Sequence, residues 1–297
     1  MRWWLGAALA VLLASQAGAQ SAPPQCQAFW DRFVGDLSEL RRTAGRGGAV
    51  AAGTILDRGW RVSDDRDGWC RVTATRDLRD LPFSSIRWQA DGVTRYLMGE
   101  GFPSRIRIAV DDVMLDGRVG KRPFDLSIGL SREDGDPALR LDALYLLTTE
   151  GRGMQVTGTL GGAYFDTRAS AALSLGSLRL HRVTARVDDV WAILDAFDLD
   201  GGSVKRDATH FLRGLRDGLS EAQFDAQSFE SARYFMGVLP NAKGVLTVTL
   251  SSEQGLGLLQ YAMAANAFEA QDKSFADVVS VALHGAAVTV DWAAAAR

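Results

Sequence analysis

Hydrophobic and polar residues alternate along this chain with two different periods, and the change of period marks its main segments. In the first segment, large apolar residues recur every three or four positions with acidic residues between them, which predicts an amphipathic helix. The glycine-rich run at residues 44–48 (AGRGG) ends this helix. Its apolar positions are Phe29, Trp30, Phe33, Leu37 and Leu40.

From about residue 53 to residue 187 the period becomes two. Such alternation places one face of a strand on a core and leaves the other face in water, which is typical of antiparallel strands. Turn-forming sequences such as EDGD, EGRG and LGG join successive segments, so we expect a long meander. The expected strands include residues 86–90, 106–110, 124–130, 139–147, 154–160, 169–175 and 183–187.

After residue 187 the helical period returns. We expect one helix capped by Asp188 or Asp189, a second capped by Asp207, and a third capped by Ser228 that ends before Pro240. A strand over residues 246–250, a helix over residues 257–267 and a last strand through Val281, Leu283, Val288, Val290 and Trp292 complete the chain. The second helix is expected to bury Phe211, Leu212, Leu215 and Leu219.

Strands dominate this pattern and helices pack against them, so the expected fold class is α+β. We predict a long, curved, mainly antiparallel sheet with helices on one face. The mature chain, residues 20–297, is expected to form a single domain. Its predicted parts are a disulfide-stapled helix and hairpin (20–80), the meander (81–188), and helices with closing strands (189–297).

The N-terminus has the order of features typical of a secretory signal. Arg2 precedes an apolar run over residues 5–14, and Ala17, Gly18 and Ala19 supply the small residues that signal peptidase requires. The run is roughly half as long as a bilayer span, which favours a cleavable signal over residues 1–19 rather than a retained anchor. No later segment approaches a membrane span. We therefore expect an exported protein in the periplasm of a Gram-negative bacterium.

Export changes the interpretation of the two cysteines, Cys26 and Cys70. An even number of cysteines in an oxidising compartment predicts a disulfide, with two buried free thiols as the alternative. A bridge closing a loop of about 45 residues would tie the first helix to a strand and stabilise the fold by roughly 4 kcal/mol.

Composition excludes some classes of function. Apolar residues make up 47% of the chain and charged residues 23%, which are ordinary values for a globular protein. The net charge is −3 and the arginines are scattered, whereas a nucleic-acid binder concentrates basic residues on one face. We therefore expect no nucleic-acid partner.

The stretch GWRVSDDRDGWCRVT, residues 59–73, combines aspartates, tryptophans and Cys70. Aligned on a calcium loop, Ser63, Asp65 and Asp67 fall on ligand positions, but Ala74 stands where a bidentate glutamate is required. An Asp-Gly turn between two strands explains the same residues without a metal. The tryptophans Trp60, Trp69 and Trp88 are interpreted as core residues, with an exposed stacking platform as the alternative.

Recognisable catalytic motifs are missing from the sequence. There is no serine-hydrolase elbow, phosphate loop or zinc motif, and His181, His210 and His284 are dispersed. We expect no enzymatic activity, no cofactor and no metal. A carboxylate pair carries no local spacing signature, so a hydrolase of cell-wall polymers stays open as a third hypothesis.

Three segments carry the same strand pattern: MQVTGTLGG, ALSLGSLRLHRVTARVDD and GVLTVTLSS. Together they resemble the AsmA-type envelope proteins, whose G-x-L-x-L strands form a curved antiparallel sheet. The resemblance implies a role in holding or moving lipids between bacterial membranes. This chain differs from that family in being short, in having a cleavable signal and in carrying two cysteines.

The segment ALRLDALYLL has apolar residues at both odd and even positions, which predicts a second apolar surface. The leading hypothesis is a non-enzymatic protein that binds an apolar, lipid-like ligand or another envelope component on its sheet. The alternative is a structural or assembly protein that docks a periplasmic partner there. The candidate surface comprises Leu141, Leu144, Tyr145, Leu146, Met154 and Val156.

Overall fold

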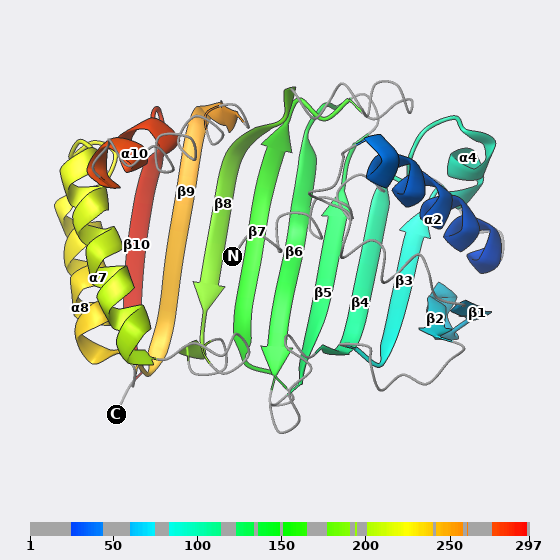
Figure 1. The fold of residues 1–297 in the computed structure, drawn as a ribbon, viewed down its shortest axis with the longest axis horizontal. Helices are drawn as coiled ribbons and strands as arrows, with labels where there is room; N and C mark the ends of the chain where they lie inside the picture. Colours follow the sequence, from blue (N-terminus) through cyan, green and yellow to red (C-terminus); the bar gives the residue numbers. More distant parts are fainter. Residues whose placement is uncertain are drawn as a thin grey trace.

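Ten β-strands lie side by side in one sheet, and their order in the sheet is their order in the chain (Figure 1). All nine pairings are antiparallel, so the expected meander is confirmed. This computed structural model describes residues 25–43, 60–74, 83–113, 123–133, 136–148, 151–164, 177–190, 194, 201–239, 242–257, 260 and 275–295. The strand expected at 169–175 lies outside these residues.

The strands are β1 (Trp60–Asp64), β2 (Cys70–Ala74), β3 (Ser85–Asp91), β4 (Arg105–Val113), β5 (Phe124–Ser131), β6 (Leu139–Thr148), β7 (Gly153–Gly161), β8 (Arg179–Val187), β9 (Gly244–Gly257) and β10 (Ala287–Ala294). The α-helices within the described residues are α2 (Cys26–Thr43), α4 (Val93–Met98), α7 (Gly201–Gly218), α8 (Ala226–Val238) and α10 (Phe275–Ala282). A short 3-10 turn, η2 (Arg66–Gly68), joins β1 to β2.

One face of the sheet is apolar across almost its whole width, and we call it the apolar face. Side chains at paired positions of neighbouring strands lie on the same face, so the pairings define rows that run across the strands. One row from β2 to β10 consists of Val72, Ile86, Val110, Leu126, Leu146, Met154, Val187, Leu246 and Trp292. The next consists of Cys70, Trp88, Ile108, Ile128, Leu144, Val156, Ala185, Val248 and Val290.

Three irregularities in the pairing keep these rows apolar where the strict period of two fails. Register shifts occur within β4, β6 and β8, where one extra residue stands opposite the neighbouring strand. Such a bulge reverses the face to which the following side chains point. Each bulge falls between apolar residues three positions apart. The pairs are Val110 and Val113, Leu141 and Leu144, and Leu180 and Val183.

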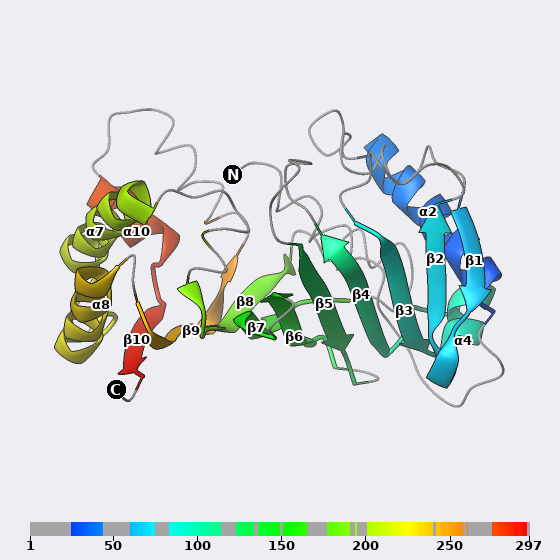
Figure 2. The same ribbon diagram turned by 90° about the horizontal axis from the view of Figure 1, so that it is seen from below.

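The helices cover the two ends of the apolar face and lie on the same side of the curved sheet (Figure 2). At one end, Phe29 and Trp30 of α2 are buried against Trp88 and its neighbours, forming the cluster that we call the α2 core. At the other end, α7, α8 and α10 pack on β9 and β10. We call the two clusters there, which include Leu215, Phe235, Val279 and Val288, the C-terminal core.

Several helix ends differ from the prediction. Helix α7 begins at Gly201, so Asp207 lies inside it and does not cap it, and Phe211 is 47% exposed instead of buried. The cap of α8 is Asp225, whose carboxylate accepts a hydrogen bond from the Ser228 backbone N–H at 2.6 Å. Ser228 is buried, and its hydroxyl oxygen accepts a hydrogen bond from the Val290 N–H at 3.1 Å.

The last predicted strand was partly wrong. Val281 lies in helix α10 and His284 in the turn after it, while the strand begins only at Ala287. The β-branched residues of this segment favour a strand locally, but the segment forms helix α10, in which Val279 is buried in the C-terminal core together with residues of α7. Strand β9 continues to Gly257, the residue at which the sequence predicts the start of a helix, and residues 261–267 lie outside the described part of the chain.

Candidate functional site

The structure brings five of the six predicted surface residues together on the apolar face. Strand β6 carries an extra residue near Asp142, so Leu141 and Leu144 point to the same side although they are three positions apart. Tyr145 pairs with Gln155 and points to the opposite, polar face. The predicted second apolar surface is therefore smaller than expected: the bulge places Leu144 and Leu146 on the same face as Leu141, while Leu147 lies with Tyr145 on the polar face. Leu141, Leu144, Leu146, Met154 and Val156 share the apolar face.

The middle of the apolar face differs from its two ends. Five half-buried residues of β7, β8 and β9 belong to none of the buried clusters formed by the described residues. Their side chains are small, and at Gly158 a Cβ atom would lie only 2.9 Å from the carbonyl oxygen of Arg182. We call this area the mid-sheet patch. It consists of Val156, Gly158, Val183, Ala185 and Val248.

The disulfide Cys26–Cys70 fixes α2 to the apolar face at the β2 end. The two cysteines are buried, with their Cα atoms 5.6 Å apart, and the predicted staple is confirmed. Cys70 is the register partner of Trp88, which stacks on Phe29 with ring centroids 4.1 Å apart. The bridge therefore joins the helix and the sheet inside the α2 core.

The stretch that resembles a calcium loop is a hairpin, as the turn interpretation predicted. Strands β1 and β2 pair directly, and Asp67 and Gly68 in η2 have φ angles of 59° and 77°. Asp65 accepts hydrogen bonds from the Arg66 backbone N–H at 2.9 Å and from Arg71 at 2.9 and 3.1 Å. Its carboxylate is thus bound by protein donors within the hairpin.

The tryptophans of this region have different environments. Trp88 is 3% exposed and belongs to the α2 core, as predicted. Trp69 is only half-buried, and the Arg87 guanidinium carbon lies 5.9 Å from the centre of its ring. The side chain of Trp60 lies outside the described part of the structure. The core interpretation therefore holds for Trp88 and not for Trp69.

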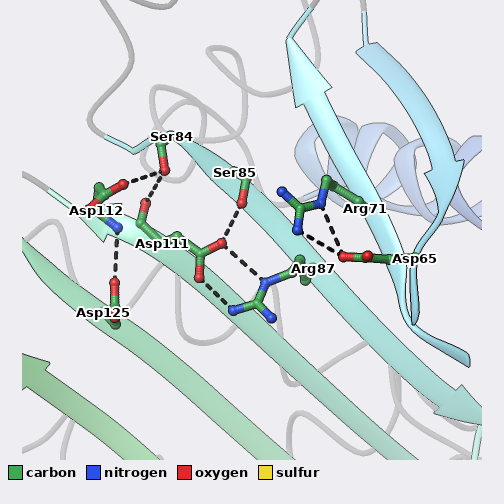
Figure 3. A network of polar contacts seen from close by, with 8 residues as sticks. All are labelled: Asp65, Arg71, Ser84, Ser85, Arg87, Asp111, Asp112 and Asp125. Carbon is green, nitrogen blue, oxygen red and sulfur yellow. Dashed lines mark hydrogen bonds and ion pairs between the residues drawn. The ribbon is translucent and has the colours of Figure 1, made fainter. Parts of the chain in front are cut away.

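We call the opposite face of the sheet the polar face. Next to the hairpin, β3 and β4 carry a network of polar side chains on this face (Figure 3). Arg87 of β3 and Asp111 of β4 form a bidentate ion pair, with nitrogen–oxygen distances of 2.7 and 3.1 Å. The hydroxyl of Ser85 also donates to Asp111. Ser84 donates to the Asp112 carboxylate at 2.8 Å and to the Asp111 backbone carbonyl at 3.2 Å, so five neighbouring residues are linked at this end of β3 and β4.

The charges in this network are stabilised in their ionised forms. Burial alone would raise the pKa of Asp111, but hydrogen bonds from Arg87 and Ser85 outweigh it and hold that pKa below its usual value. The backbone N–H of Arg66 and the side chain of Arg71 lower the pKa of Asp65. A general acid requires the opposite shift, so these carboxylates give the hydrolase hypothesis no support.

Replacing Asp111 with Asn should destabilise this end of the sheet by about 1–2 kcal/mol, because the charged hydrogen bonds are lost from a partly buried site. Since the native pKa is lowered, the contribution of Asp111 is present above the usual carboxyl pKa and disappears as pH falls through the native pKa. The difference in melting temperature between pH 7 and pH 3 should therefore shrink in D111N. Thermal unfolding followed by circular dichroism measures this difference.

The control for this prediction is Asp291→Asn, because Asp291 is exposed on the polar face of β10. It should leave the melting temperature and its pH dependence close to those of the wild type. An equal effect of both substitutions would show that the Arg87–Asp111 pair makes no specific contribution.

The three histidines lie in separate elements. His181 is the extra residue in the β8 bulge, and its Nδ1 atom lies 3.3 Å from the backbone carbonyl oxygen of Ser252. A Cβ atom at Gly161 would lie 2.5 Å from the His181 Nε2 atom, and one at Gly255 would lie 3.1 Å from its Cε1 atom, so the ring packs closely against both glycines. This histidine therefore has a structural position in the bulge.

Comparison of the chain with protein-family models, with curated proteins and with solved structures finds no match. Among the described helices, none is both long enough and apolar enough to cross a membrane.

Proposed function

We propose that this chain is an exported, non-enzymatic envelope protein that binds an apolar, lipid-like ligand on the mid-sheet patch. The supporting observation is that the apolar face is continuous, whereas the clusters of described residues that bury it leave a gap between them. The rows of apolar side chains run unbroken from β2 to β10. The α2 core and the C-terminal core bury the two ends, and the patch lies between them.

The side chains of the patch suit an apolar chain laid across the strands. Gly158 and Ala185 project little above the sheet, while the flanking cores hold bulky side chains such as Trp88 and Phe235. These small residues form an apolar floor on which a bound ligand can remove apolar surface from water. Such removal contributes about 25 cal/mol per Å² of buried apolar area. Leu144, the row neighbour of Val156, extends this floor toward β6.

The disulfide also fits the proposed export. Disulfides persist in oxidising compartments such as the bacterial periplasm and are rare in the cytosol. The Cys26–Cys70 bridge is buried on both sides, as expected of a structural bond. The signal segment at residues 1–19 lies outside the described part of the chain, so the cleavage site and the periplasmic location stay predictions.

Ala185→Phe should weaken the binding of an apolar probe at least tenfold, because the phenyl ring would cover the neighbouring small residues of the patch. The measurement is titration of the purified mature protein with a dansylated long-chain fatty acid, whose fluorescence rises in an apolar site. Native mass spectrometry of protein isolated from the periplasm would show whether a lipid co-purifies with it.

The matched control is Thr184→Phe, which adds a similar ring at the adjacent position on the opposite face of β8. It should leave probe affinity within twofold of the wild type. The proposal fails if the wild type does not bind the probe, or if both substitutions change the affinity equally. Isolation of a stoichiometric protein partner that protects the patch would instead favour the docking hypothesis.

A further inference from the structure

The polar face of β8 carries two arginines that differ from most of their neighbours. Arg182 and Arg186 are exposed, and the register places both on this face, with Thr184 between them. Within the described part of the structure, neither forms an ion pair or a hydrogen bond through its guanidinium. Four other arginines on this face each have a carboxylate partner, at 2.9 Å for Arg71, 2.7 Å for Arg87, 3.6 Å for Arg105 and 3.0 Å for Arg140. Arg61 and Arg107 share the face and also lack such a partner among the described residues, but they lie on separate strands, β1 and β4.

The side chains around these two arginines are hydroxyls and an amide. On each side of β8, the register partners of Arg182, Thr184 and Arg186 are polar and uncharged. We call these nine positions the arginine–threonine patch. The partners are Thr159, Thr157 and Gln155 on β7, and Ser251, Thr249 and Thr247 on β9.

Acidic side chains lie outside this patch. Asp291 pairs with Thr247 from the far side, one strand beyond the patch. Asp188 follows the end of β8, and its carboxylate accepts the Gly153 backbone N–H at 2.7 Å. Asp142 accepts the Ser131 hydroxyl at 2.6 Å on β6, and Glu253 lies in the inserted segment of β9 after Ser251. The nine positions themselves therefore carry two positive charges and no negative one.

We propose that the arginine–threonine patch binds an acidic polysaccharide. Each guanidinium presents a planar fork of donors that matches a carboxylate or an ester sulfate or phosphate. The two arginines are four residues apart along an extended strand, or roughly 13 Å. A single small anion cannot bridge that distance, whereas a chain with acidic groups at intervals contacts both.

The groups between the arginines fit sugar hydroxyls. Threonine hydroxyls both donate and accept hydrogen bonds, and the Gln155 amide does the same. Gln155 already donates to the Tyr145 hydroxyl at 3.2 Å, which holds an aromatic ring at the margin of the patch. No position of the patch carries a large apolar side chain that would enter a bilayer. The net charge of the whole chain is −3, so attraction of a polyanion depends on this local surface.

The test uses the full mature protein with polygalacturonate as the acidic polysaccharide and dextran as the neutral one. We expect binding of polygalacturonate that weakens as salt increases, and no binding of dextran. The double substitution R182A/R186A should lower the affinity at least tenfold without changing the melting temperature. The matched control is R61A/R107A, because Arg61 and Arg107 are also exposed on strands of the sheet and lack a carboxylate partner among the described residues.

The control pair removes the same charge and should change the affinity less than twofold. R182K/R186K keeps the charge but removes the forks, and an intermediate loss would support recognition through guanidinium geometry. Equal losses in R182A/R186A and R61A/R107A would overturn the proposal in favour of general electrostatic attraction. Absence of polygalacturonate binding, or stronger binding to phosphatidylglycerol vesicles, would also overturn it. None of these readouts depends on the apolar probe that tests the mid-sheet patch.

Discussion

Cys70→Ala will lower the free energy of unfolding by about 4 kcal/mol, because the bridge closes a loop of 44 residues and so restricts the unfolded chain. Alanine is preferred to serine because Cys70 is fully buried and a hydroxyl there would add a desolvation cost of its own. Urea unfolding under oxidising conditions, followed by circular dichroism, measures the difference between variant and wild type.

Reduction provides an internal control for this prediction. Dithiothreitol should destabilise the wild type by a similar amount and leave the variant unchanged. Cys26→Ala should match Cys70→Ala, and the double substitution should cost little more than either alone, since each removes the same bond. A loss below about 1 kcal/mol would mean that packing alone holds α2 on the sheet.

Trp88→Ala will cost about 3–5 kcal/mol, the range for deleting a large buried aromatic side chain. The indole is 3% exposed, stacks on Phe29 and lies opposite Cys70 on the neighbouring strand. Its loss leaves a cavity at the centre of the α2 core, which the disulfide prevents from collapsing freely. Chemical unfolding measures the cost, and near-ultraviolet circular dichroism reports the aromatic packing.

Trp88→Phe is the informative control, because the buried indole Nε1 has no hydrogen-bond partner among the described residues. Phenylalanine therefore loses no hydrogen bond and only part of the buried volume. We expect it to cost well under half as much as alanine. If Trp88→Ala costs less than 1 kcal/mol, this residue is not part of a closely packed core.

Much of this fold could be predicted from the sequence because its dominant interactions are local. Strict alternation in β3, β5 and β7 reports directly which face of a strand is buried. The prediction failed where a bulge interrupts the alternation, as at Asp142 in β6. The leucines of this strand are two positions apart at Leu139 and Leu141 but three apart at Leu141 and Leu144. This change of spacing is a signal in the sequence that indicates the bulge.

Other features depend on contacts between distant segments and have no local signal. The segment of α10 has strand propensity, yet it is helical, and Val279 is buried in one cluster with Leu215 and Leu219 of α7. Likewise, the mid-sheet patch is visible only when the positions of the flanking cores are known. The arginine–threonine patch can be recognised only when the register of β7, β8 and β9 is known. The bulge beside Arg182 shifts the pairing of β8 with β7 by one residue.

The strictly sequential order of the strands has a consequence for cooperativity. Each strand exchanges its hydrogen bonds only with the strands before and after it, so the stability of the sheet approaches a sum of nearest-neighbour terms, as in a repeat protein. Local unfolding at the end that carries the disulfide need not unfold the end formed by β9 and β10. From β2 to β7 the sheet can also lengthen strand by strand without closing long loops, whereas residues 188–243 separate β8 from β9, so we expect the N-terminal part of the sheet to form faster.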